Sequence, residues 1–183
     1  MALTKVNAEG INVADDFAFT GTVSGAVKAQ VQTHLVTTST QSVSANTRAN
    51  ISGLNAAIPP STSSKRIKIS VRWNGEYSHA NNYTCVYGIK RDSTDIGNPA
   101  AAGDRTIGMA VLAQNYWNSD ASSTPDSVVY SYIDSPATTS EITYHATIIS
   151  SLDGTLNNQR TVGDSDNGNH ERITSTMTLE EID

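Results

Sequence analysis

The stretch AQNYWNSDASS, residues 113–123, combines side chains that are suited to contact with a sugar. An aromatic side chain can stack on the apolar face of a sugar ring, while amides and a carboxylate hydrogen-bond the hydroxyls of that ring. The alternative is that Trp117 ends a strand and belongs to the core, because tryptophan is often mostly buried. The candidate glycan-contact residues are Asn115, Tyr116, Trp117, Asn118 and Asp120.

A second polar stretch, GDSDNGNHE at residues 163–171, resembles a calcium-binding loop in composition. An EF-hand loop needs a glycine at its sixth position and a glutamate at its twelfth. If Asp164 is counted as the first position, Gly168 is the fifth and Glu171 the eighth, so the register does not fit. We therefore expect an exposed hairpin loop and no metal site, although Asp164, Asp166 and Glu171 leave open a weakly held cation.

No motif of an enzyme class is present, since the sequence has no GxSxG element, no phosphate-binding glycine loop and no HExxH. The four histidines are scattered, and His34 and His145 fall on the polar faces of predicted strands, where surface positions are expected. The single cysteine, Cys85, excludes an intrachain disulfide and a cysteine-based zinc site. It alternates with Tyr83 and Tyr87, which predicts a small buried residue. We expect neither enzymatic activity nor a cofactor.

The composition favours strands over helices. The 183 residues include 22 serines and 22 threonines, whereas charged residues make up 16% of the chain. Threonine tolerates strands, while surface helices usually carry many glutamates, lysines and arginines. A hydroxyl-rich and charge-poor chain therefore indicates a β-sheet protein.

The charge and hydropathy patterns argue against a nucleic-acid partner and against membrane insertion. The net charge is -6, and nucleic-acid binding needs a concentrated positive field. The N-terminus lacks the apolar core of a secretory signal, and no stretch approaches the length of a membrane span. We therefore expect assembly in a cytoplasm.

From Gln30 onward, apolar residues alternate with polar ones, which is the pattern of half-buried strands. In the clearest case, RIKISVRW, the apolar side consists of Ile67, Ile69, Val71 and Trp73. The dipeptide Asn74-Gly75 then predicts a tight turn. Further strands are predicted within residues 30–36, 41–52, 82–90, 106–113, 127–133, 141–149 and 172–182.

Helical signals are weak. GLNAAIPP at residues 53–60 allows one helical turn before Pro59 and Pro60 end it. About eight short antiparallel strands bounded by turn residues predict an all-β domain over residues 30–183, a jelly-roll-like β-sandwich.

Residues 1–29 contain too few large apolar groups to form a core of their own. One face of this segment, if it is extended, carries Ile11, Val13, Phe17 and Phe19. An apolar face of this kind suits an arm that adds as a strand to the edge of a neighbouring chain. A loose N-terminal tail is the alternative.

The opening MALTKV, the segment DDFAFTGTVSG and the closing ITSTMTLEEID resemble the short fibre, appendage and head-decoration proteins of tailed bacteriophages, especially phages of marine bacteria and cyanobacteria. The resemblance covers the two ends of the chain, and residues 30–170 share with these proteins a style of hydroxyl-rich strands and polar loops. Such proteins carry a short N-terminal virion-attachment segment followed by a β-sandwich, commonly assembled as a trimer.

The resemblance implies a non-enzymatic structural protein of the virion, assembled in the host cytoplasm. Its first implied form is a homotrimeric short tail fibre or appendage, held to other virion proteins by residues 1–29 and exposing its sandwich for host attachment, with a host-surface glycan as a candidate ligand. A head fibre or a capsid head-decoration (cement) protein is the alternative within the same particle. A carbohydrate-active enzyme on host polysaccharide is the alternative of a different class, but no paired acidic motif stands out.

Overall fold

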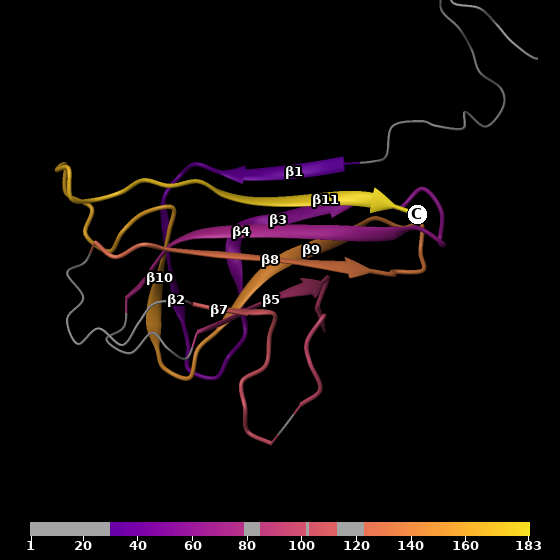
Figure 1. Ribbon diagram of the computed structural model, residues 1–183, viewed down its shortest axis with the longest axis horizontal. Helices are drawn as coiled ribbons and strands as arrows, with labels where there is room; N and C mark the ends of the chain where they lie inside the picture. Colours follow the sequence, from indigo (N-terminus) through magenta and orange to yellow (C-terminus); the bar gives the residue numbers. More distant parts are fainter. Residues whose placement is uncertain (1–29, 79–84, 102, 113–122) are drawn as a thin grey trace, which may run out of the picture.

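The computed structural model describes residues 30–78, 85–101, 103–112 and 123–183, and the regular structure of these residues consists of strands alone. Two antiparallel sheets pack face to face, so the expected all-β sandwich is confirmed (Figure 1). The strands are β1 (Gln30–Leu35), β2 (Ser39–Val43), β3 (Ala49–Ile58), β4 (Arg66–Ser78), β5 (Val86–Arg91), β6 (Thr94–Ile96), β7 (Ala110–Val111), β8 (Asp126–Asp134), β9 (Ile142–Ile149), β10 (Gly154–Asn158) and β11 (Ser175–Ile182).

Strand β4 organises the larger sheet. On one side β4 pairs with β8 along most of its length, and on the other it pairs first with β11 and then with β10. Strands β1 and β2 complete the sheet, because β1 pairs with β11 and β2 pairs with β10. In the smaller sheet β9 lies between β3 and β5, and the other side of β5 carries both β6 and β7.

The strand pairs are nested along the chain. The early strand β1 pairs with the last strand β11, β3 pairs with β9, β4 pairs with β8, and β5 pairs with β7. Each inner pair lies between the two members of the pair before it, as in one long antiparallel ribbon that has been folded over into two layers. The pair β2–β10 fits the same nesting, because along the chain it lies between the pairs β1–β11 and β3–β9.

The tight turn predicted at Asn74-Gly75 is wrong, because both residues lie inside β4. At this point β4 changes its neighbour from β11 to β10. A Cβ atom on Gly75 would lie 2.1 Å from the carbonyl oxygen of Asn157 in β10. The glycine therefore serves a close approach of two strands, and the chain does not reverse there.

The alternation predicted for β4 is confirmed, and it places large side chains between the sheets. Ile67, Ile69, Val71 and Trp73 are at most 2% exposed. The Trp73 ring meets Tyr87 of the smaller sheet, with ring centroids 5.2 Å apart. The hydroxyl of Tyr130 in β8 donates to the carbonyl oxygen of Gly88 in β5 over 3.0 Å, which also joins the two layers.

Other local predictions fail for identifiable reasons. Residues 53–58 form the second half of β3 instead of a helical turn, because Leu54, Ala56 and Ile58 alternate into the core. The strand predicted at 106–113 is reduced to the two residues of β7, and its inward alternation fails at Val111, which is 63% exposed. Ala113 lies outside the described residues. Strand β10 was not predicted, since its sequence GTLNN is mostly polar.

The sandwich has two distinct ends. Gln30 lies opposite Glu180 in the β1–β11 pair, so the start of β1 and the C-terminus are neighbours; this end, which also holds Asp134, is called the terminal end. The opposite end, called the loop end, holds the start of β8 and the connection between β10 and β11. In Figure 1 the terminal end lies at the right and the loop end at the left. The predicted arm, residues 1–29, lies outside the described residues.

Candidate functional site

Both groups of residues singled out from the sequence lie outside the described part of the chain. These are the candidate glycan-contact residues Asn115, Tyr116, Trp117, Asn118 and Asp120, and the arm residues Ile11, Val13, Phe17 and Phe19. The described residue Thr124, which follows the first group, lies at the loop end of the sandwich, where its hydroxyl donates to Glu76 over 2.8 Å. The candidate site that the structure does describe is the 163–171 loop.

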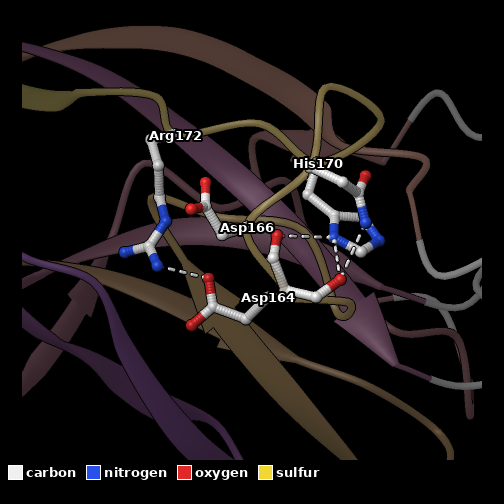
Figure 2. Close-up of a pocket in the computed structure, with 6 residues that line it drawn as sticks. Asp164, Asp166, His170 and Arg172 are labelled. Atoms are coloured by element: carbon white, nitrogen blue, oxygen red, sulfur yellow. Dashed lines mark hydrogen bonds and ion pairs between the residues drawn. The ribbon is translucent and has the colours of Figure 1, made fainter.

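This loop and the residue after it form a pocket at the loop end, here called the loop pocket, with a volume of about 330 Å³ (Figure 2). Its lining is polar throughout. The lining residues are Asp164, Ser165, Asp166, Asn167, His170 and Arg172. The expectation that this stretch is exposed is confirmed, since most of its residues are open to solvent.

Asp164 is held between two arginines at the mouth of the loop. Arg160 and Arg172 face each other in a single antiparallel bridge, and both form ion pairs with the Asp164 carboxylate. The two guanidinium groups therefore occupy the carboxylate that a cation would need first. Among the described residues, no group of three or more histidine, cysteine, aspartate and glutamate side chains is arranged to hold a metal ion.

His170 closes the other side of the loop. Its Nδ1 lies 3.1 Å from both the hydroxyl and the backbone carbonyl oxygen of Ser165. A carbonyl oxygen can only accept, so Nδ1 carries the proton and Nε2 of the neutral ring is an acceptor. In this tautomer Nδ1 is not a base for the Ser165 hydroxyl, so the pair lacks the arrangement that activates a serine nucleophile.

The residues that lead into the loop include buried amides that the sequence did not reveal. Asn158 accepts a 2.8 Å hydrogen bond from the indole nitrogen of Trp73, and Gln159 donates to the Ser175 hydroxyl over 2.9 Å. Both amide side chains are at most 1% exposed. The signal in the sequence was the run LNNQR, in which adjacent amides occur without a glycine or proline, but its polarity indicated a loop.

Unused hydrogen-bonding atoms remain in the same segment. Gln159 Oε1 and Arg160 Nε are buried and have no hydrogen-bond partner within the described residues. A buried polar atom without a partner is costly, and such atoms in native structures often mark a bound water or ligand. Two buried polar atoms next to the bridge that closes the loop thus retain capacity for further polar contacts.

Glu76 fastens the loop end to β4. It is 1% exposed, and its carboxylate accepts hydrogen bonds from the Thr124 hydroxyl over 2.8 Å and from the Val162 backbone amide over 2.6 Å. One carboxylate therefore fixes both the chain that enters β8 and the chain that enters the pocket loop. The residue was missed because the turn expected at Asn74-Gly75 would have placed it outside the core.

The remaining titratable residues of interest take structural positions. His34 is exposed, as expected, and His145 is half-buried, so burial lowers the pKa of its imidazole. Cys85 is 1% exposed, which confirms its predicted burial. Burial raises the pKa of the Cys85 thiol to about 11, so the thiol stays protonated and unreactive at neutral pH. Tyr83 and His79 lie outside the described residues.

No protein-family model matches the chain, and no curated protein matches it. Within the described residues there is no helix with the length and apolar character needed to span a membrane.

Proposed function

We propose that this chain is a non-enzymatic structural protein of a phage virion, most simply a short tail fibre or appendage that is anchored through its N-terminus. The proposal is supported by the position of the chain entry and the loop pocket at opposite ends of the sandwich. The arm of residues 1–29 must enter the sandwich at Gln30, which lies beside the C-terminus, whereas the loop pocket lies at the far end. A body held at the terminal end therefore presents its polar loops away from the particle, as the resemblance of the chain termini to phage fibre proteins implies.

We further infer that the sandwich has jelly-roll connectivity. The nested pairs β1–β11, β3–β9, β4–β8 and β5–β7 support this inference, because a jelly roll is a long antiparallel ribbon wrapped into two sheets. In that description β2 and β10 form a further nested pair, and β6 and β7 share one strand position beside β5. The sandwich therefore has two strand positions more than the eight of a simple jelly roll.

Exposed apolar side chains on β8 support assembly as an oligomer, and the phage resemblance makes a homotrimer the form to test. The outer face of this edge strand carries Val129, which is 69% exposed, and Ile133, which is 47% exposed. Apolar side chains on an open edge favour association with another chain. A second copy that covers β8 would remove this surface from water.

Removal of the arm tests the proposed function. A chain that lacks residues 1–24 should remain a folded and soluble oligomer, as measured by circular dichroism and light scattering, but should no longer enter phage particles. Incorporation at the wild-type level would refute the anchor. Imaging of intact particles that carry a label on this chain would then distinguish a tail appendage from a head-decoration protein.

A further inference from the structure

We propose that the loop pocket binds one ring of a neutral, hydroxyl-rich sugar. The proposal gives a ligand class to the exposed end of the proposed fibre, and its biological role rests on that function. The ligand class itself is argued from the side chains that line the pocket, which are shown in Figure 2.

The charges of the lining favour a neutral ligand. Asp164 is already paired with Arg160 and Arg172, so the lining keeps one further carboxylate, Asp166, and the guanidinium of Arg172. A phosphate or other anion would meet the Asp166 carboxylate, and a metal cation or amine would meet Arg172. A neutral ligand avoids both repulsions and can hydrogen-bond to both groups.

The lining offers both hydrogen-bond donors and acceptors. Asp166 is exposed and has no ion pair or hydrogen bond with another described side chain, so both its oxygens can accept. A guanidinium has five N–H donors, and the described contacts of Arg172 go to Asp164 and to the Thr38 hydroxyl at 3.0 Å, which leaves donors over. His170 adds the acceptor Nε2. Each sugar hydroxyl can donate to one of these groups and accept from another.

The size and rigidity of the pocket suit a single ring. A volume of about 330 Å³ lies at the lower end of the range for small-molecule pockets. The Arg160–Arg172 bridge closes the loop before a ligand arrives. Within the lining, His170 and Asn167 both hydrogen-bond to the Ser165 hydroxyl. A preorganised pocket loses less conformational entropy on binding.

The experiment is a titration of the isotope-labelled full-length protein with single sugars, followed by NMR of the backbone amides. The probes are glucose, galactose and mannose as neutral sugars, with N-acetylneuraminic acid, inorganic phosphate and Ca²⁺ as charged competitors for the same pocket. We expect a neutral hexose to shift the signals of Asn167 and His170 in a saturable manner, with weaker effects from the charged probes.

Two variants locate the binding. Asp166→Ala should weaken binding of that hexose about tenfold, the effect of losing a charge-assisted hydrogen bond. The matched control Asp104→Ala removes an exposed carboxylate from another loop and should leave the affinity unchanged. Neither side chain is buried, so both variants should fold.

Three results would overturn the proposal: no saturable shift with a neutral hexose, equal binding by the Asp166→Ala variant, or tighter binding of phosphate or Ca²⁺ at these residues. The outcome is separable from that of the arm deletion. If the protein binds the sugar but still enters particles without its arm, the proposed anchor is refuted and the pocket is kept. If the arm is needed for incorporation but no sugar binds, the pocket alone is refuted.

Discussion

A buried carboxylate at each end of the sandwich accepts hydrogen bonds of a different kind. At the terminal end the donors are side chains of the other sheet, whereas at the loop end they are a backbone amide and a hydroxyl from two loops. Asp134 in β8 accepts from Arg91 at 3.0 and 3.2 Å and from the Tyr144 hydroxyl at 2.8 Å, both from the smaller sheet. Glu76 instead accepts from Thr124 and Val162. The contact of Asp134 locks the two sheets together, while that of Glu76 sets the position of exposed loops.

The two ends therefore differ in how they use charged side chains. The terminal end uses its charges internally, and burial together with the Asp134 carboxylate raises the pKa of Tyr144, so its hydroxyl remains a donor at all ordinary pH values. The loop end leaves the Asp166 carboxylate and part of the Arg172 guanidinium open to solvent. Substitutions at the two ends should therefore have different consequences.

The largest effect is expected for Asp134→Ala. The change leaves Arg91 and Tyr144 without their shared acceptor between the sheets, and we expect the free energy of unfolding to fall by about 3 kcal/mol. Urea unfolding followed by tryptophan fluorescence measures this. The control is Asp95→Ala, which removes the ion pair of Asp95 with Arg48. The Asp95 side chain is 42% exposed, so the expected cost is below about 1 kcal/mol. Equal costs would contradict the role given to Asp134.

A smaller effect, confined to the loop end, is expected for Glu76→Gln. The amide keeps the size of the side chain but weakens charge-assisted hydrogen bonds, at a cost of about 2 kcal/mol. Hydrogen exchange should accelerate at the Val162 amide while exchange in β9 stays unchanged. The control is Glu180→Gln at the terminal end, where the side chain is 37% exposed and pairs with Lys68. Uniform acceleration across both sheets would show that Glu76 does not act locally.

The smallest effects concern pH, and they should have opposite signs at the two ends. At the loop end, burial raises the pKa of Asp126 above its ordinary value of 3.8. The folded state therefore binds the proton of the Asp126 carboxyl more tightly than the unfolded chain does. The contribution of Asp126 to stability is present below the unfolded-state pKa and is lost as pH rises through the folded-state pKa. Asp126→Asn should thus stabilise the protein at neutral pH, and the gain should disappear below about pH 3.

At the terminal end, Glu181 should behave in the opposite way. Burial pushes its pKa up, but two hydrogen bonds from Ser61 and the nearby Lys65 charge outweigh burial, so the pKa lies below its ordinary value of 4.5. The contribution of Glu181 to stability is present above the unfolded-state pKa and is lost as pH falls through the folded-state pKa. Glu181→Gln should therefore destabilise at neutral pH and converge with the wild type in acid. Unfolding free energies at several pH values test both variants, and shifts of the same sign would refute the contrast.

The sequence predicted what depends on local alternation and missed what depends on contacts between distant segments. The apolar side of β4 from Ile67 to Trp73 follows from a period of two, and it was correct. Asn74-Gly75 has the local signal of a turn, yet the close approach of Asn157, more than 80 positions away in the chain, decides its conformation. Local sequence cannot report such a contact.

The loop pocket was predictable in place but not in chemistry. The polar run at 163–171 indicated an exposed loop, and most of its residues are open to solvent. The pairing of Asp164 with Arg160 and Arg172 depends on a bridge that closes the loop. The neighbouring buried amides hydrogen-bond to Trp73 in β4 and to Ser175 in β11, so composition alone could not identify these contacts.

The most direct test of the proposed orientation is cysteine labelling on intact particles. Cys85 is buried, so a maleimide should report on one introduced cysteine, either Ser165→Cys at the loop end or Ser63→Cys beside the terminal end. In the isolated protein both exposed positions should react at similar rates. On purified virions we predict fast reaction at Ser165→Cys and protection of Ser63→Cys; equal reaction at both positions, or protection of the loop end, would contradict attachment through the terminal end.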